Sequence, residues 1–303
     1  MNKSEAPLIS VVIPTYNYAR LLPRAIESVL PQLSAESELL VIDDGSTDDT
    51  HQVLDSMSRR YPGTFRFLRK ENGGAASARN LGLRASFGKF LVFLDADDEL
   101  AASALGALAE HIATHPQSQV VLAPHWAVDT DGRRRLHVLP PIPDDPLERL
   151  KSYLLEKRIA ISHGACAMHR EVFSRGGYPE EFRNGEDIPV FAQAVANYSC
   201  SVLTAPMAII YKHDDSLRHR LDYSLAGGGR LVDEVFSAKR QPLGFQVLKE
   251  AYRTQRNLSL FRGAYISGDK RTAKNLFREA VRQDFRVVFK WAYARKAIRL
   301  WVG

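Results

Sequence analysis

Residues 90–98 read Phe90-Leu91-Val92-Phe93-Leu94-Asp95-Ala96-Asp97-Asp98, an apolar run that ends in aspartates. Such a run, in a chain whose other apolar runs are flanked by helical patterns, predicts a buried strand at the centre of a sheet. Its carboxylates then lie at the carboxyl end of that strand, the edge at which open α/β sheets bind ligands. The stretch therefore predicts an α/β fold with a site at that edge.

Aspartates crowded at one edge need a counter-charge, and a divalent cation supplies it. Mg²⁺ or Mn²⁺ fits best, because these hard cations take few carboxylate ligands and complete their shell with phosphate and water. The alternative is an acidic helix start, in which Asp97 or Asp98 caps a helix that begins at Glu99. Residues elsewhere in the chain decide between the two.

Strand and helix patterns alternate before this strand. Apolar runs at 8–13, 39–42 and 65–68 predict three further strands, each followed by polar or glycine-rich residues. Parallel winding brings the carboxyl ends of these strands to one edge. We expect a Rossmann-like mixed, mainly parallel sheet flanked by helices. The dinucleotide motif G-x-G-x-x-G is absent after the first strand, and so is the P-loop.

The second half of the chain has a looser pattern. Further elements are predicted as strands at 119–122, 165–168 and 202–211, a hairpin turn at Asp131-Gly132, and helices at 147–156 and from Glu186-Asp187 onward. Beyond 227–229 the pattern is helical throughout. We therefore expect a domain at 1–225, with halves at about 1–100 and 101–225, and a helical region at 226–303.

Composition limits the classes to which the protein can belong. The 303 residues, 45% hydrophobic, suffice for one large α/β domain with an extension. Residues 1–8 lack the apolar core of a signal peptide, and no run of about 18 apolar residues could span a membrane. We expect a cytosolic protein in which Cys166 and Cys200, lacking C-x-x-C spacing, are reduced core residues.

The formal net charge of +6 is unevenly distributed. Residues 226–303 hold 17 Lys and Arg against 6 Asp and Glu, a net of +11, and residues 1–225 carry −5. No nucleic-acid-binding motif accompanies this charge, so we expect no nucleic-acid partner. Residues 283–303 mix aromatic with basic side chains, which favours peripheral contact with an anionic membrane surface. Packing of these aromatics on the body or on a second subunit is the alternative.

Five short motifs occur along the chain, and their order and spacing are informative. They are Ser10-Val11-Val12-Ile13-Pro14-Thr15-Tyr16-Asn17, Asp43-Asp44-Gly45-Ser46-Thr47-Asp48, Asn72-Gly73-Gly74 with Ala78-Arg79-Asn80, Asp95-Ala96-Asp97-Asp98, and Glu186-Asp187. In order and spacing they resemble family 2 glycosyltransferases of the GT-A fold, over about residues 8–215. The resemblance implies an inverting enzyme that moves a sugar from a nucleotide-diphosphate sugar, UDP-linked, to a saccharide or lipid-linked acceptor. The implied setting is cell-surface polysaccharide or glycolipid synthesis at the cytosolic face of the membrane.

The resemblance also assigns residues to the donor. The nucleotide sugar is expected to contact Pro14, Thr15, Tyr16, Asp44, Gly74, Arg79 and Asp95. Tyr16 can stack on a pyrimidine ring while Asp44 accepts a hydrogen bond from its N–H. Gly74 allows close backbone approach, and Arg79 offers donors to phosphate or ribose oxygens.

The same resemblance assigns the metal ligands and the catalytic base. Asp97 is expected on the Mn²⁺ or Mg²⁺ ion, Asp95 on the ribose or a metal-bound water, and His213 is a further candidate ligand. Asp98 is expected to cap a helix rather than to bind metal. Asp187 is expected to take the proton from the acceptor hydroxyl, with Glu186 in acceptor binding. Capping of a helix by these two acids is the alternative.

Two other functions are compatible with such a sheet. A nucleotidyltransferase shares the sheet and the metal, but it needs a basic glycine-rich loop after the first strand, which is absent. A non-catalytic sugar-nucleotide-binding protein is the second alternative, and the presence of Asp97 and Asp187 argues against it.

Overall fold

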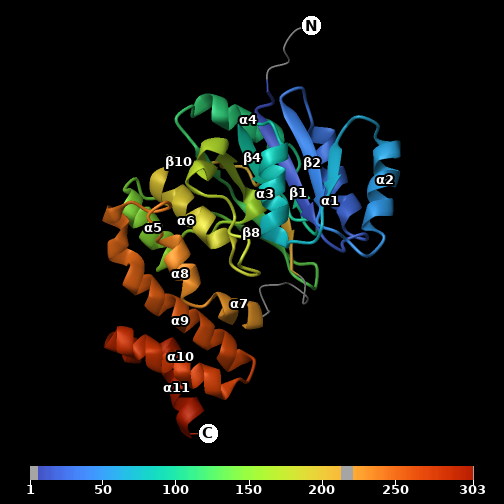
Figure 1. The fold of residues 1–303 in the computed structure, drawn as a ribbon. Coiled ribbons are helices and arrows are strands. Elements are labelled where there is room, and N and C mark those ends of the chain that lie inside the picture. Colours follow the sequence, from blue (N-terminus) through green and yellow to red (C-terminus); the bar gives the residue numbers. More distant parts are fainter. Residues whose placement is uncertain (1–5, 213–220, 303) are drawn as a thin grey trace.

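Two sheets form the body of the protein in the computed structural model, which describes residues 6–212 and 221–302 (Figure 1). The larger sheet has the strand order β10-β6-β9-β4-β1-β2-β3 and the smaller one β5-β11-β7-β8. The strands of the larger sheet are β1 (Ile9–Thr15), β2 (Ser37–Asp43), β3 (Arg66–Arg69), β4 (Phe90–Phe93), β6 (Val120–Leu122), β9 (Cys166–His169) and β10 (Cys200–Val202). Those of the smaller sheet are β5 (Glu99–Leu100), β7 (His125–Val128), β8 (Arg134–His137) and β11 (Ala208–Tyr211).

The predicted parallel winding is confirmed. Strand β1 pairs in parallel with β2 and β4, and β2 pairs in parallel with β3. The register sets Thr15 beside Asp43 and Asp43 beside Arg69, so these strands end together. Only β9, among the described strands of the larger sheet, runs antiparallel to its neighbours β4 and β6. The sheet is therefore mixed and mainly parallel.

Helices cover both faces of the larger sheet, because side chains along a strand alternate between them. Ile9, Val11 and Ile13 of β1 pack with α1 (Leu22–Val29), α2 (Thr50–Arg60) and α4 (Ala104–Thr114). Val12 points the other way and packs with α3 (Ala75–Ala85) and α6 (Asp187–Asn197). Burial on both faces explains the continuous apolar run of β1.

Two expectations about local structure are wrong. The single strand predicted at 202–211 is two strands in different sheets, because Leu203 bonds to the backbone of Leu122 and Met207 to that of Pro124, on either side of a turn. Asp98 does not cap a helix either. Residues after it form β5, and α4 begins at Ala104. The hairpin turn at Asp131-Gly132 is confirmed, with Gly132 at φ +80° between β7 and β8.

The C-terminal region is helical, as predicted. Its helices are α7 (Leu221–Gly227), α8 (Arg230–Val235), α9 (Lys249–Ile266), α10 (Lys270–Gln283) and α11 (Trp291–Val302). Val232 of α8 and Tyr252 of α9 pack with α5 (Pro146–Leu154) and α6, so the beginning of this region is part of the body. The second half of α9 packs with α10 and α11 around Phe261, and these helices project from the body (Figure 1). In the described part of the chain no helix has the length and hydropathy needed to cross a bilayer.

Candidate active site

The carboxyl ends of β1, β2 and β4 open onto a cavity of about 760 Å³. Its lining includes every described residue that the sequence assigned to donor, metal or base, namely Pro14, Thr15, Tyr16, Asp44, Gly74, Arg79, Asp95, Asp97, Glu186 and Asp187. His213, the remaining candidate, lies outside the described residues. The motifs therefore converge on one concave site, the usual location for small-molecule chemistry.

Asp44 anchors one wall of the cavity. Its side chain is 2% exposed and accepts hydrogen bonds from Lys70 Nζ at 2.7 Å and from the backbone N–H of Gly74 at 2.7 Å. The Gly73 N–H and Asn72 Nδ2 donate to it as well, at 3.0 and 3.1 Å. One carboxylate thus holds the 72–74 loop, at whose end Gly74 adopts φ +90° just before α3 begins at Ala75. Contact of Asp44 with a nucleobase stays a prediction.

Tyr16 lies at the rim of the cavity, on a loop that is tied down beside it. Asn17, in the left-handed region at φ +59°, accepts a hydrogen bond from the Thr47 N–H at 2.8 Å. Its own N–H donates to Ser46 Oγ at 3.0 Å. The loops that follow β1 and β2 are therefore joined, and the ring of Tyr16 remains 43% exposed. An aromatic face fixed at a cavity rim is suited to stacking on a flat ring.

The three aspartates after β4 have different environments. Asp95 pairs with Arg79, while Asp97 accepts a hydrogen bond from the Tyr18 hydroxyl at 3.4 Å. Asp98 is buried and accepts from the backbone N–H of Tyr211 at 2.9 Å, which fastens the acidic stretch to β11. Burial and the charges of Asp95 and Asp97 raise the pKa of Asp98 to about 9. The part of this rise that comes from Asp95 and Asp97 reflects repulsion between neighbouring carboxylates, which a cation would relieve.

Arg79 bridges the two sides of the cavity. Its Nη2 donates to Asp95 Oδ1 at 2.9 Å and its Nη1 to Glu186 Oε1 at 2.8 Å, and its side chain is 7% exposed. Burial acts to lower the pKa of Arg79, but the two carboxylates outweigh it and raise that pKa. Conversely, Arg79 overcomes the effect of burial on Asp95 and holds the pKa of Asp95 below its ordinary value. Its expected contact with phosphate or ribose oxygens stays a prediction.

Asp187 is the first residue of α6, beside Glu186. Glu186 is engaged by Arg79, whereas Asp187 forms no ion pair with any other described residue. Burial, reinforced by the charge of Glu186, raises the pKa of Asp187 to about 6 against the opposing effect of Arg79. A carboxylate with this pKa is ionised at neutral pH and basic enough to take a proton, as a general base requires.

Sequence reasoning missed several residues that line the cavity, among them Tyr18 and Arg183. Tyr18 follows Tyr16 closely in the chain, and its hydroxyl positions Asp97. Arg183 just precedes Glu186, and its guanidinium lies over Gly74, where a Cβ would come within 2.5 Å of Nη1. His163 lines the cavity as well. It is buried, its Nε2 lies 3.1 Å from the Tyr178 hydroxyl, and burial together with Arg79 lowers its pKa to about 3.

Asp95 and Asp97 are the groups that could hold a metal ion. Among residues 6–212 and 221–302, no three Asp, Glu, His or Cys side chains form a complete metal site. Mg²⁺-type ions, however, are commonly bound by one or two carboxylates, with substrate phosphate and water as the other ligands. The carboxylates of Asp95 and Asp97, both in the lining of the cavity, fit such an ion.

Comparison of the sequence with known proteins gives a family match. Residues 10–177 match the glycosyl transferase family 2. The minor teichoic acid biosynthesis protein GgaA of Bacillus subtilis is 32% identical over 136 residues, which are 43% of this chain and 30% of GgaA. Among its most similar curated relatives, the chain spans from 13% to 54% of their length.

Comparison of the structure gives the same fold. S. aureus TarS 1-349, solved in complex with UDP-GlcNAc, aligns with a TM-score of 0.69 at 21% identity and covers 97% of this chain and 89% of its own. The mannosyltransferase PcManGT from Pyrobaculum calidifontis, solved with GDP-Man and Mn²⁺, has a TM-score of 0.56 at 19% identity, over 97% and 84% of the two chains. At these identities the likeness is one of fold, and the predicted GT-A architecture is confirmed.

Proposed function

Because the chain belongs to glycosyl transferase family 2, we propose that it transfers a sugar from a nucleotide-diphosphate sugar to a saccharide or lipid-linked acceptor. The observation that carries this proposal is the bridge of Arg79 between Asp95 and Glu186. The bridge joins Asp95, on the proposed nucleotide side of the cavity, to Glu186, the neighbour of the proposed base Asp187. The residues that bind the donor and those that bind the acceptor would thus be held at a fixed distance from each other, as a transfer reaction requires.

We propose a UDP-linked donor. Tyr16 would stack on the base, and Asp44 and the 72–74 loop would receive the nucleoside, since both border the cavity beside Tyr16. The diphosphate would lie toward Gly74, whose missing side chain lets the Arg183 guanidinium lie against the backbone there. The UDP-GlcNAc complex of TarS supports this choice of nucleotide.

We propose Mn²⁺ or Mg²⁺ as the cofactor, held by Asp97 and Asp95. When bound, such an ion offsets the negative charge that grows on the diphosphate as the glycosidic bond breaks. The Mn²⁺ in the complex of PcManGT supports the proposal. In this chain Tyr18 would orient Asp97 through its 3.4 Å hydrogen bond, and Asp98 would fix the backbone of the stretch through Tyr211.

We propose that transfer inverts the anomeric centre. The acceptor oxygen would attack the anomeric carbon while the bond from that carbon to the diphosphate oxygen breaks. The acceptor proton would pass to a carboxylate oxygen of Asp187, and the nucleoside diphosphate would leave. A pKa of about 6 would let Asp187 take the proton at neutral pH, and Glu186, engaged by Arg79, would orient the acceptor.

We propose that the acceptor belongs to cell-surface polysaccharide or glycolipid synthesis, at the cytosolic face of the membrane. The name of GgaA, a teichoic acid biosynthesis protein, supports a cell-surface polymer. The two rival functions gain no support from the cavity. Nothing in its described lining suggests a nucleotidyltransferase, and the poised pKa of Asp187 is unnecessary for a protein that only binds a sugar nucleotide.

A donor panel tests the proposal. The full chain is incubated with UDP- and GDP-sugars, with or without saccharide acceptors, and release of the nucleoside diphosphate is measured with Mn²⁺ and with chelator. We expect Mn²⁺-dependent release of UDP from one UDP-sugar. Pyrophosphate formed from a nucleoside triphosphate and a sugar phosphate, without release from any sugar nucleotide, would instead identify a nucleotidyltransferase. Binding of a UDP-sugar without turnover under any of these conditions would favour the non-catalytic alternative.

A further inference from the structure

The last segment of the chain exposes large apolar side chains. Phe289 is 78% and Trp291 70% exposed, and Phe285, Ile298 and Trp301 are exposed as well. They lie on the short 3-10 helix Phe285–Phe289 and on α11, at the end of the projecting helices. Large apolar side chains that gather in one exposed place mark an interaction surface.

The exposed side chains are not those that fold this segment. Val287 packs with Leu258 and Ala280, and Ala297 and Leu300 pack with Phe261. The inward set accounts for the docking of α11 on α9 and α10. Of the outward set, Trp301 has its ring centroid 6.0 Å from that of Phe277, and the other four side chains belong to no core cluster of the described residues. Between α10 and α11 the outward set continues into a groove of about 500 Å³, lined by Phe277, Arg278, Val281, Arg282, Val288, Ala297, Ile298 and Trp301.

Basic side chains surround this apolar surface. Residues 270–302 contain ten Lys and Arg against two acids, a net charge of +8. Lys274 and Arg278 lie over the ring of Trp301, at 5.6 and 5.5 Å from its centroid, so cations and aromatics share one surface. Aromatic and basic side chains together are the composition of a surface that enters the headgroup region of a bilayer.

We propose that residues 270–302 dock on an anionic lipid bilayer. The aromatic side chains would enter the headgroup boundary, and the Lys and Arg side chains would contact lipid phosphates. The positive charge of this segment favours an anionic bilayer as its binding partner. A second copy would bring a net charge of +8 against the same +8, and a nucleic acid would leave Phe285, Phe289 and Trp291 without an apolar partner.

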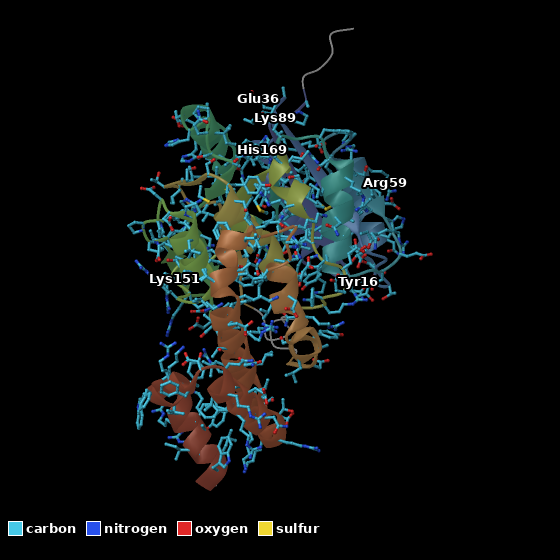
Figure 2. The ribbon with its side chains drawn as sticks, turned by 60° about the vertical axis from the view of Figure 1, so that its left-hand side comes forward. Tyr16, Glu36, Arg59, Lys89, Lys151 and His169 are labelled. Carbon is cyan, nitrogen blue, oxygen red and sulfur yellow. The ribbon has the colours of Figure 1, made fainter. Side chains whose placement is uncertain are left out.

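The proposed bilayer-binding surface and the opening of the active site lie toward the same end of the body. In Figure 2, Tyr16 lies at the end of the body nearest the projecting helices, whereas Glu36 and Lys89 lie at the opposite end. A bilayer at α10 and α11 would therefore be near the rim of the cavity. For a lipid-linked acceptor, which rests on the proposed function, docking would confine enzyme and acceptor to one surface.

Flotation with lipid vesicles tests the inference. The full chain is mixed with vesicles of phosphatidylcholine alone, or of phosphatidylcholine with phosphatidylglycerol, and the bound fraction is measured at low and high salt. We expect binding to the anionic vesicles, weakened but not abolished by salt, since apolar insertion is insensitive to screening. Absence of binding, or equal binding to neutral vesicles, would overturn the inference. The assay contains no sugar nucleotide, so its failure is distinct from failure of the proposed function.

Matched variants separate insertion from charge. The pair F289S and W291S removes exposed rings that make no core contact, so the chain should fold and its affinity for anionic vesicles should fall by about tenfold or more. The pair K290E and R299E should lower affinity at low salt and reduce the salt dependence. Phe87 is exposed and comes two residues before Lys89, which lies at the far end of the body in Figure 2, so F87S should bind like the wild type.

Two further readouts exclude the other occupants. Gel filtration should give the same oligomeric state for the wild type and for the variant carrying F289S and W291S. A wild-type dimer that this double substitution dissociates would assign the surface to a second copy. Vesicle binding should also persist in the presence of excess duplex DNA and of RNA. If DNA or RNA displaces the protein from the vesicles and itself binds the protein tightly, the surface would be assigned to nucleic acid.

Discussion

The guanidinium of Arg79 donates to the carboxylate of Glu186 at 2.8 Å, although the two residues are 107 positions apart. The same guanidinium donates to Asp95 at 2.9 Å. A single buried cation therefore sets the spacing between the acidic stretch after β4 and the acids that begin α6. Without it, two carboxylates would face each other across the cavity with no positive charge between them.

The first prediction concerns this bridge. Arg79→Ala should lower the free energy of unfolding by about 2 kcal/mol, because Glu186 and the partly exposed Asp95 lose the cation between them. Arg79→Lys keeps the charge but cannot bond both carboxylates in the same way, so it should fold with a smaller loss yet transfer sugar poorly. Urea unfolding and steady-state kinetics measure the two effects. Wild-type stability in the alanine variant would show that the bridge is dispensable.

The second prediction concerns the metal. Asp97→Ala should abolish the increase in UDP affinity that Mn²⁺ produces, while the weaker affinity without metal stays unchanged. Isothermal titration of UDP with and without Mn²⁺ measures both. Asp98→Asn is the matched control, because the amide oxygen can still accept the hydrogen bond from Tyr211. An equal loss of the Mn²⁺ effect in both variants would contradict the assignment of Asp97.

The third prediction separates the base from its neighbour. Asp187→Asn keeps the size of the side chain but removes the proton acceptor, so kcat should fall by on the order of a hundredfold or more at unchanged donor affinity. Glu186→Gln retains an oxygen that can accept from Arg79 and should lose less. If the glutamine variant proves the slower of the two, the role of base passes to Glu186.

The fourth prediction is the pH dependence of transfer. With a pKa of about 6, Asp187 is ionised above that pH, so kcat should fall about tenfold per pH unit below it. The Asp187→Asn variant should lack this acid limb. The groups that interact electrostatically with Asp187 are Arg79, Asp95, Tyr153, Lys157, Tyr178, Glu186, Tyr252 and Arg256. An acid limb that persists unchanged in the asparagine variant would assign the titration to one of these.

The same pKa determines how Asp187 affects stability. Its value in the folded protein is raised above the ordinary 3.8, so the folded state binds this proton more tightly than the unfolded state does. Its contribution is thus fully present below about pH 4 and is lost as pH rises toward 6. As pH rises across this interval, the wild type should therefore lose unfolding free energy relative to Asp187→Asn.

The sequence predicted the location of the site because that location depends on local patterns. Parallel strands that end in polar residues must present them at one edge, and Tyr16, Asp44, Asp97 and Asp187 do line one cavity. Long-range pairing was not predictable. No local pattern connects Arg79 to Glu186.

The errors have the same origin. Asp98 was expected to cap a helix, yet its carboxylate bonds to the backbone of Tyr211, a contact between residues 113 positions apart. The strand predicted at 202–211 is divided because its two halves pair with different parts of the chain, Val202 with Leu122 and Ala208 with His125. Hydropathy could not separate the halves, since both are apolar. In the tail, composition indicated apolar residues, but not that Val287 faces inward while Phe289 faces outward.

The last prediction tests whether Asp44 holds the 72–74 loop. In Asp44→Asn, one carboxylate oxygen becomes an N–H₂ group facing the donors that now surround it, among them Lys70 and the Gly74 N–H. Loss of such buried hydrogen bonds should cost about 1–3 kcal/mol of unfolding free energy. A loosened loop should also raise KM for the donor.

Tyr16→Ser is the matched comparison for Asp44→Asn. Tyr16 is exposed at the rim, so its loss should raise donor KM with little change in stability. Thermal unfolding and donor kinetics, measured on both variants, distinguish the two roles. If Asp44→Asn is as stable as the wild type and shows only a changed preference among nucleotide bases, Asp44 reads the base directly and the loop is held by other contacts.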